Sequence, residues 1–165
     1  MYLRRNKRHH EEKIRTEESH KIQKETYRIE TMLKHRDALH QKIEEFKAKH
    51  ASERKKASPA EKLKIDRKIY EEFLHLNDMD YFYREMDTVL NNLVSKLRTR
   101  YPSLTSKEVM WCCLYLLNVP VFDIYLLLDY KVDSLKKMRQ RLAHKINLSG
   151  VTELDDFLTK MLTEL

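Results

Sequence analysis

The densest run of side chains that could do chemistry lies between residues 131 and 145. Six lysines and arginines stand there against a single acid, Asp133. Apolar residues recur three or four positions apart through the same run, so a helix would bury one face: Leu135, Met138, Leu142 and Ile146. The outward face would then carry hydrogen-bond donors, which are Lys136, Lys137, Gln140, Arg141 and His144.

Long donors on such a face can reach base edges in a groove of double-stranded DNA, and flanking donors can hold its phosphates. The flanking donors here are Lys131, Ser134, Arg139 and Lys145. An ordinary solvated amphipathic helix is the alternative interpretation. The C-terminal residues favour the DNA-binding interpretation, because acids outnumber bases from Glu153 onwards. The anion-binding surface is therefore confined to one element.

Residues 103–165 are expected to form a domain of four short helices that positions this basic helix. A capping box, Thr105 with Glu108, begins a nearly buried first helix. Pro120 opens a short second helix, and Asp129 makes a tight turn into the basic helix. Thr152 is predicted to cap the last helix. Two helices joined by a tight turn, the second of them basic, are typical of a helix-turn-helix.

The stretch from 104 to 148 resembles the LuxR-type (GerE-like) helix-turn-helix without a gap. The residues that carry the resemblance are Leu104-Thr105-x-x-Glu108, Asn118, Ile124, Leu127-Leu128, Ser134-Leu135, Arg139, Arg141-Leu142 and Lys145-Ile146-x-Leu148. The resemblance implies a transcriptional regulator that binds DNA as a dimer. It places Lys136, Lys137 and Gln140 in the groove, and it implies dimerisation partly through the last helix, at Leu154, Phe157 and Leu158. Arg141 and His144 are expected to join the phosphate donors.

Two residues depart from the family's pattern. Tyr125 stands where a small residue lets the two helices approach closely, and Phe122 replaces an exposed lysine. A bulky side chain at 125 predicts a shifted recognition helix, and an exposed ring at 122 indicates a protein contact. A degenerate helix-turn-helix used for protein assembly without DNA binding is therefore the alternative function.

Residues 1–56 are expected to form one long charged helix that pairs as a homodimer. Its apolar residues follow a heptad pattern, with Ile22, Ile29 and Ile43 at one seam position and Met32, Leu39 and Phe46 at the other. A solvated single helix is the alternative. The pattern leaves open whether the helix pairs in parallel or folds back on the connector.

Residues 57–102 are expected to form a two-helix connector. Ser58-Pro59-Ala60-Glu61 is a capping box that begins the first helix, and Asn77-Asp78 separates it from the second. Tyr101-Pro102 ends that second helix, because proline disfavours the helical conformation of the preceding residue.

The composition points to an all-α protein and away from an enzyme. Of 165 residues, 36% are charged and only Gly150 is a glycine. The lack of further glycines excludes glycine-rich phosphate loops. Cys112 and Cys113 are adjacent, which is unsuited to a disulfide framework or a zinc site, and no other cluster has metal-ligand spacing. We expect no cofactor, no small-molecule substrate and a reducing, cytoplasmic location.

The basic segment Tyr2 to Arg8 resembles the flank that follows a membrane helix on its cytoplasmic side. The chain could therefore be the cytoplasmic part of a membrane protein with a span upstream. An ordinary basic N-terminus is the alternative.

Overall fold

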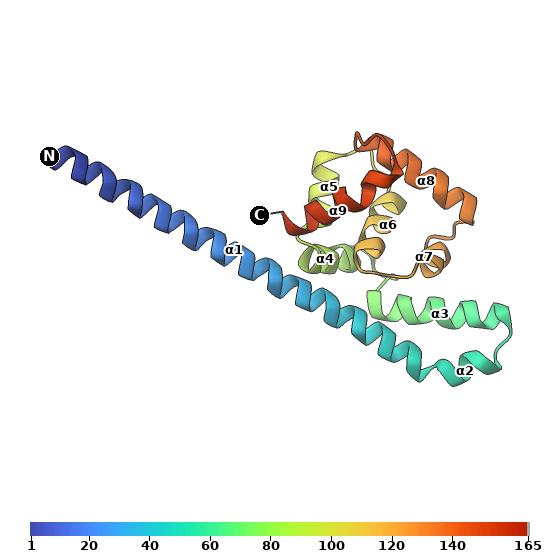
Figure 1. Ribbon diagram of the computed structural model, residues 1–165. Helices are drawn as coiled ribbons and strands as arrows, with labels where there is room; N and C mark the ends of the chain where they lie inside the picture. Colours follow the sequence, from blue (N-terminus) through green and yellow to red (C-terminus); the bar gives the residue numbers. More distant parts are fainter. Residues whose placement is uncertain (165) are drawn as a thin grey trace.

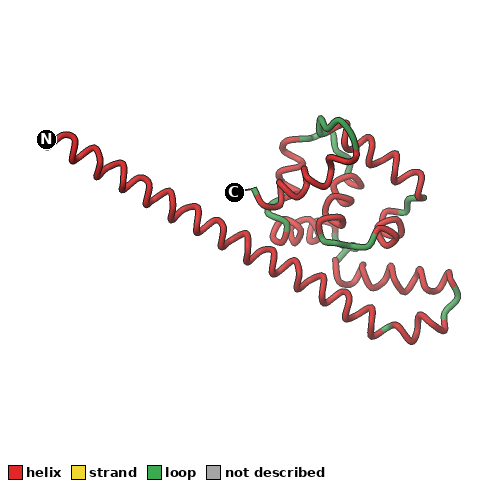
Figure 2. The backbone as a smooth tube through the Cα atoms, in the orientation of Figure 1, coloured by secondary structure: helices red, strands yellow, loops and turns green. Residues whose placement is uncertain are grey.

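The computed structural model describes residues 1–164, and within that range the chain is helical with no strand (Figures 1 and 2). The helices are α1 (Tyr2–Lys49), α2 (Ala51–Lys56), α3 (Pro59–Leu74), α4 (Met79–Val89), α5 (Leu93–Arg100), α6 (Ser106–Leu116), α7 (Val121–Leu128), α8 (Val132–Lys145) and α9 (Leu154–Thr163). The all-α expectation is confirmed. None of the described helices is both long and apolar enough to cross a membrane.

Helix α1 folds back on the connector along its second half and projects from the body along its first half (Figure 1). Residues 1–24 are all exposed, whereas Ile29, Met32 and Ile43 are buried. They join the core formed with α3 and α4. Phe46 meets the ring of Phe73 with 4.7 Å between centroids.

The seam predicted for a coiled coil is thus filled by the chain itself from residue 29 onwards. Leu39 and Phe46 are half-buried on the same side, so the sequence interpretation of these positions as dimer contacts is corrected to intramolecular packing. An apolar stripe needs a partner surface but does not specify which one. Ile22 alone of the seam residues stays exposed, at 55%.

The connector contains three helices, α3, α4 and α5, instead of the predicted two. Asn91 and Asn92 interrupt the second one, because both adopt a left-handed backbone with φ of 55° and 56°. The Asp87 carboxylate then accepts the backbone amides of Val94 and Ser95 at 2.8 and 3.2 Å. The helix that follows therefore starts with its first donors satisfied.

Helix α6 is the centre of the C-terminal domain. Cys112, Cys113 and Leu114 are fully buried, and the predicted Thr105–Glu108 capping box is present. Helices α5, α7, α8 and α9 all pack against it. The expectation of Thr152 as a helix cap is wrong, because residues 151–153 form a 3₁₀ turn and α9 begins after it at Leu154 without a side-chain cap.

Candidate nucleic-acid interface

Helix α8 lies at the edge of the C-terminal domain, on the side away from α1 (Figure 1). Four side chains hold it to the body and are at most 3% exposed: Leu135, Met138, Leu142 and Ile146. These are the residues whose spacing predicted the buried face. Since α1 runs along the other side of the body, the outward face of α8 is open to solvent.

The outward face gathers the donors expected from the sequence. Ser134, Lys136, Lys137, Gln140, Arg141 and His144 are all exposed, and so is Lys131, which precedes the first turn. Part of this face is a shallow depression of about 490 Å³ that Lys137, Gln140 and Arg141 line together with His144 and Lys145. The structure therefore brings the three groove-facing candidates onto one surface with four of the phosphate candidates.

The exposed basic side chains of that face form no ion pair within the described residues, although Asp133 lies on the same helix. Lys131, Lys136, Lys137 and Arg141 take part in no ion pair there. The half-buried lysines of the body differ, since Lys47, Lys96 and Lys145 are all paired with acids. The uncompensated charge is what a polyanion would meet.

Lys145 is turned away from the phosphate role predicted for it. Its ammonium donates to both carboxylate oxygens of Glu108, at 2.9 and 3.0 Å, and to the carbonyl of Ser103 at 3.2 Å. The Glu108 side chain is 3% exposed. Lys145 is therefore the counter-ion that compensates a buried carboxylate inside the domain.

Arg139 is also drawn inward. Its guanidinium carbon lies 5.5 Å from the ring centroid of Trp111, and the residue is half-buried. Trp111 in turn stacks on Tyr115 at 5.0 Å. This stack links α8 to α6, so Arg139 contributes to the attachment of α8 as well as to the charge at its side.

Acidic side chains lie on α9 and on the turn before it. The hydroxyl of Tyr115 donates to Asp155, and its burial and this bond raise the pKa of Tyr115 to about 12. Ser149 donates through its hydroxyl and its amide to Glu153, at 2.6 and 3.0 Å, which lowers the pKa of Glu153. The Glu153 carboxylate stays ionised at neutral pH, and its 3₁₀ turn packs on α8, so the basic surface ends there.

The turn between α7 and α8 has the expected conformation, but the packing of the two helices differs from the close approach that the family resemblance implies. Asp129 takes the left-handed conformation with φ of 56°, as expected. Tyr125 is half-buried, and each of the two helices packs mainly on other elements, α7 on α3 and α6, and α8 on the 3₁₀ turn at residues 151–153 and on α6. Phe122 is 81% exposed, and its ring lies edge-to-face with that of Tyr125, with 6.1 Å between centroids.

The last helix offers little of its predicted dimer surface. Leu154 and Leu158 are buried, at 1% and 0% exposed. Phe157 is half-buried, with its ring 5.9 Å from that of Tyr101. A contact between copies through α9 would have to use Phe157 and the polar side chains around it.

Arg67 of α3 reaches the α7–α8 turn, and no sequence signal identified it. Its guanidinium donates to the carbonyl of Leu126 at 2.6 Å and to the carboxylate of Asp129. The two partners lie about sixty positions further along the chain, so no local pattern could connect them.

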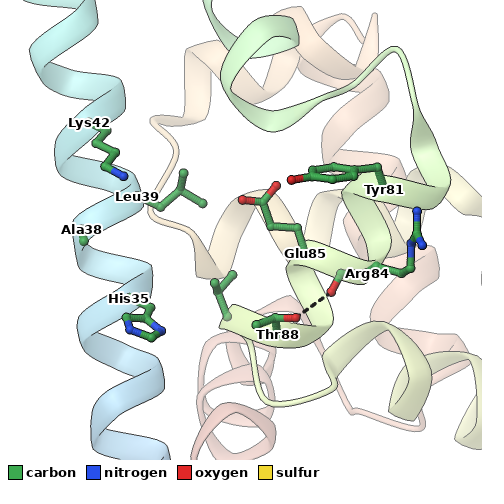
Figure 3. Close-up of a pocket in the computed structure, with 9 residues that line it drawn as sticks. His35, Ala38, Leu39, Lys42, Tyr81, Arg84, Glu85 and Thr88 are labelled. Carbon is green, nitrogen blue, oxygen red and sulfur yellow. Dashed lines mark hydrogen bonds between the residues drawn. The ribbon is translucent and has the colours of Figure 1, made fainter.

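A second concave region lies between α1 and α4 (Figure 3). It encloses about 570 Å³, and Leu39 and Glu85 extend toward one another across it. One Glu85 oxygen is buried without a hydrogen-bond partner among the described residues, and burial raises the pKa of this carboxyl group. The groove is formed by α1 and α4 and contains no residue of α8, so it is not part of the α8 surface.

Metal-ligating side chains are not clustered in residues 1–164, where no three of His, Cys, Asp and Glu lie in position to share an ion. Cys112 and Cys113 are free thiols, and burial raises the pKa of both. They are therefore poor metal ligands and poor nucleophiles at neutral pH.

Comparison of the chain with protein-family models, with curated proteins and with solved structures found no significant match.

Proposed function

We propose that the protein is a dimeric transcriptional regulator of the LuxR-type helix-turn-helix class, which binds double-stranded DNA through the outward face of α8. The observation that carries the proposal is the run of exposed donors on α8, whose four unpaired cations lie on the side of the body opposite α1. A helix held by a buried apolar stripe and basic outside has the shape and charge that enter a major groove.

In the proposed complex, Lys136, Lys137 and Gln140 contact base edges. Lysine donates to the acceptors of guanine, and glutamine pairs with adenine through two hydrogen bonds. Lys131, Ser134, Arg141 and His144 contact the phosphates on either side, while Arg139 stays stacked on Trp111 and Lys145 stays paired with Glu108. Neutralised phosphates release counterions, so the affinity falls steeply with salt.

A dimer would read two half-sites about one helical turn apart. The seam from Ile29 onwards is occupied within the chain. The projecting part of α1, with Ile22, is therefore the part of the long helix that remains for contact with a second copy.

The test is a selection of bound fragments from random duplex DNA, repeated with alanine variants. Lys136→Ala or Gln140→Ala is expected to relax the preference at one base position, at a cost of about 1–3 kcal/mol in discrimination. Arg141→Ala is expected to weaken binding to every sequence alike and to reduce the salt slope by about 1. Lys160→Ala, an exposed lysine of α9, is the matched control and should change neither property.

Assembly without DNA is the second candidate function, and the exposure of Phe122 favours it. Val121 beside it is 54% exposed, so two apolar side chains stand together at the start of α7. Contiguous exposed apolar surface can mark a protein contact. If neither random duplex nor a genomic pool binds at low salt, and Phe122→Ala lowers the particle size measured by light scattering, this function replaces the first.

A further inference from the structure

Helix α7 is tied at both of its ends to the hairpin formed by α1 and α3. Near its start, the Asp123 carboxylate accepts a hydrogen bond from Lys47 Nζ at 2.7 Å and another from the hydroxyl of Tyr70. The Lys47 ammonium also lies 4.7 Å from the centroid of the Tyr70 ring. These groups are largely buried, so this end is fixed by packing as well as by charge.

At the other end, one arginine holds the turn that leads into α8. The guanidinium of Arg67 donates to the carbonyl of Leu126, in the last turn of α7, and to the carboxylate of Asp129, the residue between the helices. Both bonds come from the same nitrogen, Nη2, whose two N–H groups are fixed in the plane of the guanidinium, whereas the N–H groups of an ammonium rotate freely. Arg67 therefore fixes the direction in which the chain leaves α7.

Leu128, which is 2% exposed, and Tyr130, which packs against the core with Lys107 Nζ 4.7 Å from its ring centroid, flank the turn, but the residue between them depends on Arg67. Asp129 is in the left-handed conformation, which residues other than glycine adopt at a cost. Lys131, which precedes the first turn of α8, forms no side-chain cap. Asp129 itself is 68% exposed in its side chain, so contacts with the core do not hold it in place.

We propose that Arg67 is a positioning residue for DNA binding: it fixes the α7–α8 turn and thereby the angle at which α8 meets a groove. This inference rests on the proposed function and adds to it a contact from α3, outside the helix-turn-helix. Through Arg67, the hairpin of α1 and α3, which carries the projecting part of α1, contacts the turn that leads into the proposed DNA-binding helix.

The test compares Arg67→Ala with Lys68→Ala, an exposed neighbour on the same helix without a charged partner in the described residues. Arg67→Ala is expected to lower the affinity for duplex DNA by about threefold to tenfold. The slope of log affinity against log salt should stay unchanged, because no phosphate contact is lost. Arg67→Lys should restore part of the loss, and Lys68→Ala should behave like the unaltered chain.

A loss of about one unit of salt slope in Arg67→Ala would overturn the proposal, since Arg67 would then bind a phosphate itself. Hydrogen exchange supplies a readout that does not need DNA. The amide of Tyr130 donates to the carbonyl of Tyr125 at 3.1 Å across the turn, and in Arg67→Ala its exchange should accelerate about threefold or more while amides of α6 keep their rates. An unchanged Tyr130 amide refutes the positioning role, whereas absent DNA binding with an accelerated amide refutes only the proposed function.

Discussion

Replacing Lys145 with alanine should destabilise the fold instead of weakening a phosphate contact. The variant leaves the Glu108 carboxylate, 3% exposed, with the Thr105 amide at 2.9 Å as its remaining donor from the capping box. Removal of one partner of a buried pair costs about 3–5 kcal/mol. The surviving capping bond puts the expected loss at the lower end of that range.

For a chain of this length a loss of about 3 kcal/mol lowers the melting temperature by roughly 6–12 °C. Thermal unfolding followed by circular dichroism measures it, with Lys136→Ala as the exposed control expected to change stability by less than about 0.5 kcal/mol. A double-mutant cycle with Glu108→Gln separates the pair from other effects of truncation. A Lys145→Ala variant that melts like the control and loses about one unit of salt slope in DNA binding refutes the reasoning, because Lys145 would then be a phosphate ligand.

Three further predictions concern other parts of the molecule. The pKa of Tyr115 is raised from 10.0 to about 12, so the folded protein keeps this proton at a pH where the unfolded chain has lost it. The resulting stabilisation is complete below the unfolded pKa and disappears as the pH rises through the folded pKa. In Tyr115→Phe the melting temperature should therefore fall less steeply between these two pKa values. The thiols of Cys112 and Cys113 are buried, so alkylation by iodoacetamide should follow global unfolding, and rapid labelling of the folded chain would contradict their placement. Deletion of residues 1–24, all exposed, should move the melting temperature by no more than about 2 °C, and a larger drop would mean that this segment packs on the body.

The parts of the fold that follow from local chemistry could be predicted from the sequence. The two capping boxes at Ser58 and Thr105 form as expected, because each needs only residues three positions apart. The outward face of α8 also follows from local spacing, since the periodicity of its apolar residues fixes which side is buried. Both features depend on a single helix.

Features that depend on distant contacts could not be predicted in the same way. The heptad pattern of α1 predicted which of its side chains are buried against another surface. That surface is provided by α3 and α4. Only the tertiary arrangement decides between these helices and a second copy of the chain. The same holds for Lys145, whose partner Glu108 lies 37 positions earlier, and for Arg67 at the α7–α8 turn. The local sequence of a basic helix does not show which of its basic side chains has a partner inside the protein.

One signal for the missed helix break was present in the sequence. Asn91-Asn92 is a pair that tolerates the left-handed conformation, with Asp87 ahead of it to receive the new helix's amides. The apolar stripe through Leu90, Leu93 and Val94 continues across the break, which is why periodicity alone predicted one helix there.

The central claim, that α8 is a DNA-binding face, is tested most directly by fluorescence anisotropy of labelled random duplex titrated with the protein. The measurement compares the unaltered chain with a double charge reversal, Lys136→Glu with Arg141→Glu, at two exposed side chains that form no ion pair in the described residues. Binding is expected to weaken by orders of magnitude between about 50 and 200 mM salt, and to be lost in the reversed variant while the melting temperature stays unchanged. Equal binding by both chains, or no binding by the unaltered chain at the lowest salt, would contradict the central claim.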